Sequence, residues 1–285
     1  MTALARAIAV VIAGVAAGSV IFNLAAYRGA ARYRRRYPVP CAEETFDRSL
    51  AGLLAWVGAF VREAAVTALL VLTVPFGLRR HRVRELGDGP ARRPVVLLHG
   101  YAQHTANFLW LARRLRRDGW VHVYSVRHTA LGGDIERSAA RLGDVIDGIR
   151  RACGASHVDI VAHSMGGLVA RACIRARGGA SGIGRLITLG TPHQGTRVFS
   201  ALRVEPMLLQ MRPESPLLSR LGADDPVPSL VDCTAIYSVD DALVVPSSAA
   251  YYPGAFNIEL RGLGHMSMLF SARVYELVRE NLAPA

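Results

Sequence analysis

The hexapeptide AHSMGG at 162–167 constrains this chain more than any other part of its sequence. It ends the apolar run HVDIVAHS and begins a segment with the pattern of a helix. A serine between a buried strand and a helix lies on a tight turn that exposes its hydroxyl at the carboxyl end of the sheet. The small residues Ala162 and Gly166 on either side of Ser164 permit the close backbone approach of such a turn. The motif therefore predicts a nucleophile at Ser164, whereas a simple helix cap would leave the partners described below unexplained.

From Pro94 to the C-terminus the chain alternates between expected strands and expected helices. The expected strands are 94–100, 121–126, 157–164, 185–190, 234–239 and 256–260. The expected helices are 105–118, 134–153, the segment from Met165 and a last helix from about Met266. Regular β-α-β alternation predicts an α/β fold, a mostly parallel sheet with helices on both faces. We expect residues 94–285 to form one catalytic domain, in which 197–231 is either a lid or a packed crossover.

A serine nucleophile needs a basic histidine, and the histidine needs an orienting carboxylate. In a fold of this class the acid and then the histidine follow the serine along the chain. His265 lies between the last expected strand and the last expected helix, which predicts that it is the base. Asp241 follows the strand 234–239 and precedes an apolar turn, so we expect it to be the acid. Asp240 stays the alternative, because neighbouring residues of an extended segment point to opposite sides.

Two backbone N–H groups should stabilise the oxyanion that develops during acyl transfer. Met165, directly after the nucleophile, is predicted to supply one, and Tyr101, in the loop after the first expected strand, the other. The sequence has no H-E-x-x-H motif, no carboxylate cluster and no P-loop. It therefore predicts no metal site and no other cofactor.

Residues 1–93 form a separate N-terminal region with apolar segments and basic linkers. Residues 7–26 are an uncharged run that would span about 30 Å as a helix, the thickness of a bilayer core. We expect a membrane signal anchor, with a cleaved signal peptide as the alternative. A second apolar stretch, 50–78, is interrupted by Arg62 and Glu63. It is a second span, an interfacial helix or a helix packed on the catalytic domain.

The chain has 285 residues and a formal net charge of +12, and all of its cations are arginines. Residues 1–93 hold 14 of the arginines against six acids, so most of the excess lies beside the apolar segments. This pattern fits the surface of an anionic membrane, and it weakly favours a cytoplasmic catalytic domain. No nucleic-acid-binding motif accompanies the arginines, so nucleic acid is not an expected partner. The oligomeric state is left open.

Five segments in this order resemble bacterial triacylglycerol lipases and their esterase relatives: LLHGYAQ, AHSMGG, TLGTPHQGT, YSVDDALVVP and GLGHMSML. The resemblance covers about residues 94–282, and AHSMGG is similar to the elbow of small Bacillus-type lipases. It implies the α/β-hydrolase fold, a triad of Ser164, Asp241 and His265, and hydrolysis of lipid or other small carboxylic esters through an acyl-enzyme. The N-terminal 93 residues have no counterpart in a minimal secreted lipase. Acyltransferase, thioesterase and phospholipase activities remain alternatives, as does a membrane-bound scaffold without turnover.

Overall fold

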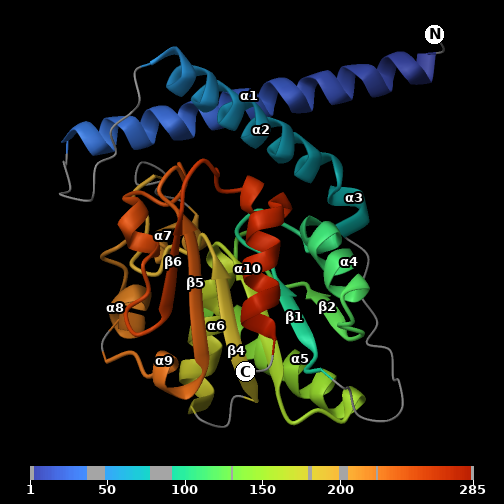
Figure 1. The fold of residues 1–285 in the computed structure, drawn as a ribbon, viewed down its shortest axis with the longest axis vertical. Coiled ribbons are helices and arrows are strands. Elements are labelled where there is room, and N and C mark those ends of the chain that lie inside the picture. The colour runs from blue at the N-terminus through green and yellow to red at the C-terminus, as the bar shows by residue number, and fades with distance from the viewer. Residues whose placement is uncertain are drawn as a thin grey trace.

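A computed structural model describes most of the chain and is drawn in Figure 1. The described ranges are 3–36, 49–77, 92–129, 131–178, 182–198, 205–222 and 224–283. Pro38, Pro40 and most of Gly87–Pro94, whose prolines and glycines predict linkers, lie outside them.

Six parallel strands form one sheet in the order β2-β1-β3-β4-β5-β6. Their bounds are β1 (Val95–Leu98), β2 (Val123–Val126), β3 (Val158–His163), β4 (Ile183–Leu189), β5 (Asp232–Ser238) and β6 (Phe256–Leu260). Every expected strand is present, and the predicted α/β fold class is confirmed. The strand β1 (VVLL) is wholly apolar and buried, as expected where helices cover both faces of the sheet.

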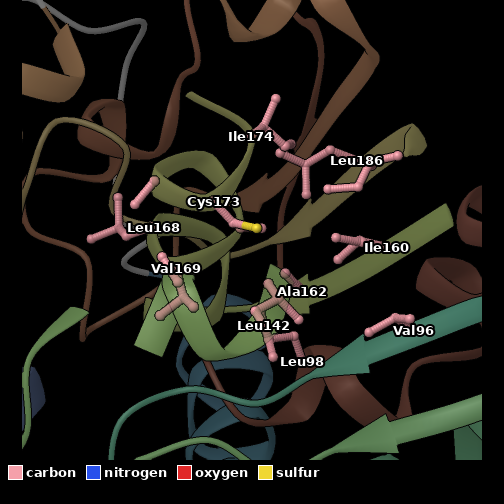
Figure 2. Close-up of a cluster of buried hydrophobic side chains, with 14 of the residues drawn as sticks. Val96, Leu98, Leu142, Ile160, Ala162, Leu168, Val169, Cys173, Ile174 and Leu186 are labelled. Atoms are coloured by element: carbon pink, nitrogen blue, oxygen red, sulfur yellow. The ribbon is translucent and has the colours of Figure 1, made fainter. Parts of the chain in front are cut away.

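The two faces of the sheet carry separate cores, and β1 shows why. Val96 and Leu98 point toward α5 (Ile135–Cys153) and α6 (Met165–Arg177), whereas Val95 and Leu97 point to the opposite side. That opposite core is covered by η1 (Thr105–Phe108), α4 (Leu109–Arg117) and α10 (Ala272–Leu282). Figure 2 shows the first core, with Ile160 of β3 facing Cys173 of α6. Each fully buried large aliphatic side chain here stabilises the fold by about 1.5–3 kcal/mol.

The last helix begins later than the sequence pattern predicts. The expected helix from about Met266 is instead a short 3-10 turn, η4 (Ser267–Phe270), followed by α10. Ser271 separates the two with extended backbone angles, and its hydroxyl accepts the amide N–H of Val274 at 3.3 Å. Ser271 therefore fixes where α10 begins. Apolar periodicity does not reveal this break, because it continues through the 3-10 turn.

The segment between β4 and β5 contains three short helices, α7 (Pro206–Gln210), α8 (Pro216–Gly222) and α9 (Val227–Leu230). Met207 and Leu217 are buried in the core beside α6, as are Leu208, Met211, Leu218 and Leu221. The described part of 197–231 packs on the domain as a crossover does, and a lid role for the segment stays a prediction.

Two long helices, α1 (Ala3–Arg36) and α2 (Leu50–Leu72), run in opposite directions across the carboxyl end of the sheet (Figure 1). Each is long and apolar enough to cross a membrane by length and composition. The short helix α3 (Val74–Gly77) follows α2. The buried face of α1 is the stripe of Ser19, Asn23, Ala26 and Ala30. The described residues of 50–78 form helices that contact the catalytic domain, through Glu63 and Leu70 of α2 among others.

Candidate active site

Ser164 lies on the turn between β3 and α6, with φ 56° and ψ −129°. Such backbone angles are unfavourable for a residue with a side chain and are typical of a strained nucleophile turn. Gly166 is needed here, because a Cβ on it would lie 2.5 Å from the carbonyl oxygen of Leu98. The structure therefore holds Ser164 at the carboxyl end of the sheet by packing that only small neighbours permit.

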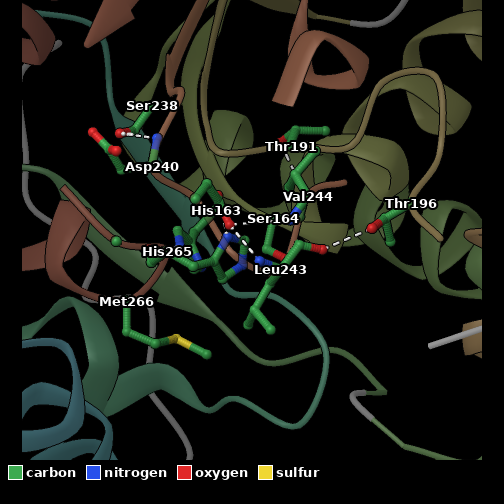
Figure 3. Close-up of polar contacts among 12 residues, drawn as sticks. His163, Ser164, Thr191, Thr196, Ser238, Asp240, Leu243, Val244, His265 and Met266 are labelled. Carbon is green, nitrogen blue, oxygen red and sulfur yellow. Dashed lines mark hydrogen bonds and ion pairs between the residues drawn. The ribbon is translucent and has the colours of Figure 1, made fainter. Parts of the chain in front are cut away.

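His265 and Asp241 form a buried pair, with Nδ1 of the imidazole 2.6 Å from Oδ2 of the carboxylate. The other carboxylate oxygen, Oδ1, accepts the amide N–H groups of Leu243 at 2.7 Å and Val244 at 3.0 Å. A histidine that donates its Nδ1–H to a carboxylate keeps Nε2 free as a proton acceptor. Figure 3 shows His265 beside Ser164, and both residues line one cavity. The structure thus pairs His265 with Asp241 and places His265 and Ser164 on the lining of the same cavity.

Electrostatics favour the protonated form of His265. Burial disfavours the imidazolium, but the charge and hydrogen bond of Asp241 and the charge of Glu63 outweigh it, so the pKa of His265 is raised. His163, next to the nucleophile, is different: its burial holds its pKa well below the usual range. His163 is therefore neutral, and it binds the histidine loop through Nε2, 3.0 Å from the carbonyl oxygen of His265.

The loop after β1 passes directly against the nucleophile. A Cβ on Gly100 would lie 2.8 Å from the Cβ of Ser164, so this loop can approach only because residue 100 is a glycine. The side-chain oxygen of Gln103 accepts the Gly100 amide at 2.7 Å and fixes the turn. Tyr101 follows in this loop, and Met165 begins α6, where the first N–H groups have no intrahelical acceptor. Both predicted oxyanion donors therefore belong to segments adjoining Ser164.

Two threonines of the TLGTPHQGT segment support the site by hydrogen bonds to its backbone. The Thr191 hydroxyl donates to the carbonyl oxygen of Ser164 at 2.9 Å, and the Thr196 hydroxyl donates to that of Leu243 at 2.8 Å (Figure 3). One threonine thus holds the nucleophile turn, and the other holds the loop that carries the acid.

Ser164 and His265 open into a mostly apolar cavity of about 360 Å³. Its walls come from three parts of the chain. The N-terminal helices and α3 supply Phe22, Thr67, Leu70, Val71 and Val74; the segment after β4 supplies Leu208 and Met211; and the loops around the site supply Tyr101, Leu243 and Met266, among others. The region before residue 94 therefore forms part of the site.

Three residues of the site were not predicted from the sequence. Glu63 accepts two amide N–H groups of the histidine loop, His163 binds the same loop, and Gly190 makes room for the acid–base pair. A Cβ on Gly190 would lie 3.1 Å from Oδ2 of Asp241 and 3.3 Å from Nδ1 of His265. Only Glu63 had a signal in the sequence, because a charge inside an apolar run needs a buried partner. Among the described residues, no group of three or more potential ligands could hold a metal ion.

Comparison with known proteins shows the family and the fold. Residues 94–252 match the model of a family described as palmitoyl protein thioesterase. The fold is similar to that of a lipase from Bacillus licheniformis in its mature form, at 16% identity, over 70% of this chain and 96% of that one, with a TM-score of 0.59. It is also similar to lipase B of Aspergillus fumigatus, at 14% identity, over 99% of this chain and 81% of that one, with a TM-score of 0.65. At these identities the two structures establish the shared fold.

Proposed function

The chain belongs to the palmitoyl protein thioesterase family and is an ester hydrolase of the α/β-hydrolase fold, and from this premise we propose that it cleaves lipid acyl esters through an acyl-enzyme on Ser164. The observation that carries the proposal is the apolar cavity into which Ser164 and His265 both open. Clefts that bind small molecules typically have volumes of about 300–1,000 Å³ and few polar groups, and this cavity fits that description.

In the proposed reaction, Nε2 of His265 takes the proton of the Ser164 hydroxyl as Oγ attacks the ester carbonyl carbon. Asp241 stabilises the imidazolium, and the amides of Tyr101 and Met165 bind the oxyanion. The C–O or C–S bond of the tetrahedral intermediate then breaks, and the leaving group takes the proton from His265. Water repeats the sequence on the acyl-enzyme, which releases the carboxylic acid and restores the serine.

The cavity wall favours an acyl chain as the group bound before cleavage. Leu70, Val71 and Leu208 offer hydrocarbon surface, and burying a methylene group against such a wall contributes about 0.8 kcal/mol. We therefore expect kcat/KM to rise with acyl length until the chain fills the cavity. Apart from Ser164 and His265, the polar exceptions on this lining include Thr67, Gln103, His104, Asn107 and Thr196.

Thioester hydrolysis is a second candidate function, which the family match favours. The same steps apply with a thiolate as leaving group, since Ser164 attacks an acyl carbon in both cases. Purified full-length protein in detergent should be assayed on p-nitrophenyl esters of graded acyl length and on acyl thioesters of the same lengths. Turnover of neither series, together with no labelling by a fluorophosphonate, would support the alternative of a scaffold without catalysis. Transfer to added alcohols in place of water would favour an acyltransferase.

We also propose that the α1–α2 pair holds the enzyme on a membrane. Large apolar side chains are exposed along both helices: Ile8, Val10, Val11, Ile21 and Leu24 on α1, and Leu50, Leu53, Leu54, Val57 and Val61 on α2. An exposed apolar surface of this extent is typical of an interaction site. Arg28 and Arg32 are exposed near the end of α1, where they suit anionic headgroups. Lipid is therefore the proposed cover of this face.

The packing of α1 favours insertion over a full span. Its buried stripe begins at Ser19, and residues 6–18 before it are exposed except the half-buried Val15, so we take 3–18 as the part that enters lipid. Sixteen helical residues reach about 24 Å, less than the roughly 30 Å of a bilayer core. A docked α1 would therefore enter the membrane from one side without crossing it.

A further inference from the structure

We propose that Glu63 of α2 is a positioning residue for His265: its carboxylate holds the histidine loop in the reactive arrangement. This inference rests on the proposed hydrolase function, and it assigns to the N-terminal region a role in the chemistry itself. It follows from the contacts, burial and charge of a residue some two hundred positions before the loop that it binds.

The Glu63 carboxylate binds the loop with both of its oxygens. Oε1 accepts the amide N–H of Met266 at 2.6 Å, and Oε2 accepts that of Ser267 at 2.9 Å. Met266 directly follows His265, so one of these bonds is formed by the peptide unit of the base itself. Two N–H donors on one carboxylate are the arrangement that an ionised side chain prefers.

Burial and close packing make this contact specific. Glu63 is 2% exposed, and a buried carboxylate without partners would be strongly unfavourable. A Cβ on Gly264 would lie 2.5 Å from the Cδ atom of Glu63, so the loop approaches the carboxylate only through a glycine. The neighbouring Arg62 also binds this loop, at the carbonyl oxygen of Gly262. Both charges that interrupt the apolar sequence of α2 are therefore partners of the histidine loop.

The loop is held from the opposite side by His163, whose Nε2 lies 3.0 Å from the carbonyl oxygen of His265. The peptide unit that follows the base thus has a partner at each end, His163 at its carbonyl oxygen and Glu63 at its N–H, and Glu63 supplies the one with charge. Small displacements of a catalytic group can cost large factors in rate, so rigid support of this kind matters for turnover.

Burial raises the pKa of Glu63, although the N–H groups of Met266 and Ser267 and the charge of His265 act against this shift, and in its ionised form Glu63 also acts through its charge. A negative group near the imidazole favours the imidazolium that forms when Ser164 loses its proton, and it contributes to the raised pKa of His265. Around Glu63 and His265, the other ionisable groups are Asp241, His163, His99, Tyr27, Asp240, Arg62 and Arg34. Since these stay in place, replacing Glu63 alone isolates its own effect.

The test compares the full-length protein with Glu63→Gln, Glu63→Asp and a control, Glu136→Gln. Glu136 is an exposed carboxylate on α5 that pairs with Arg220, so its loss changes the net charge equally without touching the histidine loop. The readouts are kcat and KM on p-nitrophenyl butyrate from pH 5 to 9, the rate of fluorophosphonate labelling, and thermal melting.

For Glu63→Gln we expect kcat to fall roughly tenfold with KM nearly unchanged, because one N–H loses its acceptor and the base loses its support. The acidic limb of the pH profile should move down by about half a unit, because the positive charge on His265 loses a stabilising neighbour. Glu63→Asp keeps the charge but is one methylene too short to hold both N–H groups. Its kcat should fall while its acidic limb stays near that of the wild type. The control should match the wild type in both.

A Glu63→Gln protein with normal kcat, or with reduced kcat and an unmoved acidic limb, would overturn the proposal. If that variant does not melt cooperatively, the aspartate variant decides: normal kcat, or an acidic limb that has moved as far as loss of the charge would move it, refutes the role. A wild-type protein that neither turns over esters nor labels would refute the proposed hydrolase instead. The two failures are therefore distinguishable.

Discussion

Asp240 and Asp241 are adjacent in sequence, yet their carboxylates bind different groups of the histidine loop. Oδ2 of Asp241 lies 2.6 Å from Nδ1 of His265 and is buried, whereas the exposed Asp240 accepts the amide N–H of Gly262 through Oδ2 at 2.6 Å. The backbone turns here, with the Asp241 N–H bonded to the carbonyl oxygen of Ser238 at 3.2 Å, and the two side chains leave this turn toward different partners. Only one of the two can therefore orient the imidazole.

Replacing each aspartate separately tests this difference. Asp241→Asn should reduce kcat roughly a thousandfold or more, because an amide cannot stabilise the imidazolium and favours the wrong tautomer. Asp240→Asn should change kcat by about threefold at most, because its carboxylate is exposed and touches only the loop backbone. Steady-state kinetics on one p-nitrophenyl ester measure both. Equal losses in the two variants would show that the acid is misassigned.

Ser164→Ala should abolish both ester hydrolysis and fluorophosphonate labelling while the protein stays folded. Loss of the nucleophile removes the acyl-enzyme route and several orders of magnitude in rate. Gel-based labelling measures the first effect, and the melting curve measures folding. The alanine also relieves no clash, so the melt should stay close to that of the wild type. Persistent labelling would place the nucleophile elsewhere.

The pH dependence follows from the raised pKa of His265. The base must be neutral to accept the serine proton, so kcat/KM should fall as the pH drops through this pKa, with a midpoint above the ordinary value of about 6.5. The shift also links to stability, because the folded state binds the proton more tightly than the unfolded one. That contribution to the free energy of unfolding is complete below about pH 6.5 and disappears as the pH rises through the folded-state pKa. A kinetic midpoint below pH 6 contradicts the assignment.

Gly190 offers a test of the space around the acid–base pair. Its φ is +55°, and an added Cβ would lie 2.5 Å from the Cε atom of Met268 as well as close to the pair. Gly190→Ala should therefore lower kcat. Gly154→Ala is the matched control, because Gly154 has φ +61° but open space around it. Both variants should lose about 1 kcal/mol of stability from the backbone alone, and only the first should lose activity. Comparable kcat values in the two variants would show that Gly190 is not needed to make room for the acid–base pair.

If lipid covers the N-terminal part of α1, membrane binding depends on the exposed apolar side chains there. Val10→Glu combined with Val11→Glu places two charges on side chains that are 71% and 59% exposed. Flotation of the full-length protein with phosphatidylcholine–phosphatidylglycerol vesicles should fall at least tenfold, because charges in hydrocarbon cost several kcal/mol. Val121→Glu with Leu131→Glu is the control, with 68% and 58% exposure on the catalytic domain. Equal flotation of the two variants would argue that lipid does not cover α1.

The sequence alone determined the fold class and the order of the chemistry-bearing segments. Strands of buried apolar residues and the small residues around Ser164 are local patterns, because they record what one segment needs from its own backbone. The family match and the neighbouring structures confirm the α/β-hydrolase resemblance. The predicted start of the last helix was too early. The apolar pattern continues through a short 3-10 turn, and Ser271 then caps the N-terminus of α10.

Tertiary structure alone decided which parts of the chain meet at Ser164. Glu63 reaches the histidine loop, Phe22 and Val71 wall the cavity, and Gly190 makes room for the pair, although all are distant from their partners in sequence. Sequence periodicity does not predict such long-range contacts, because they depend on how the α1–α2 pair lies across the end of the sheet. In sequence, Glu63 is a charge that interrupts an apolar helix. In the fold, that helix lies over the histidine loop, and the loop's N–H groups supply the partners that a buried carboxylate requires.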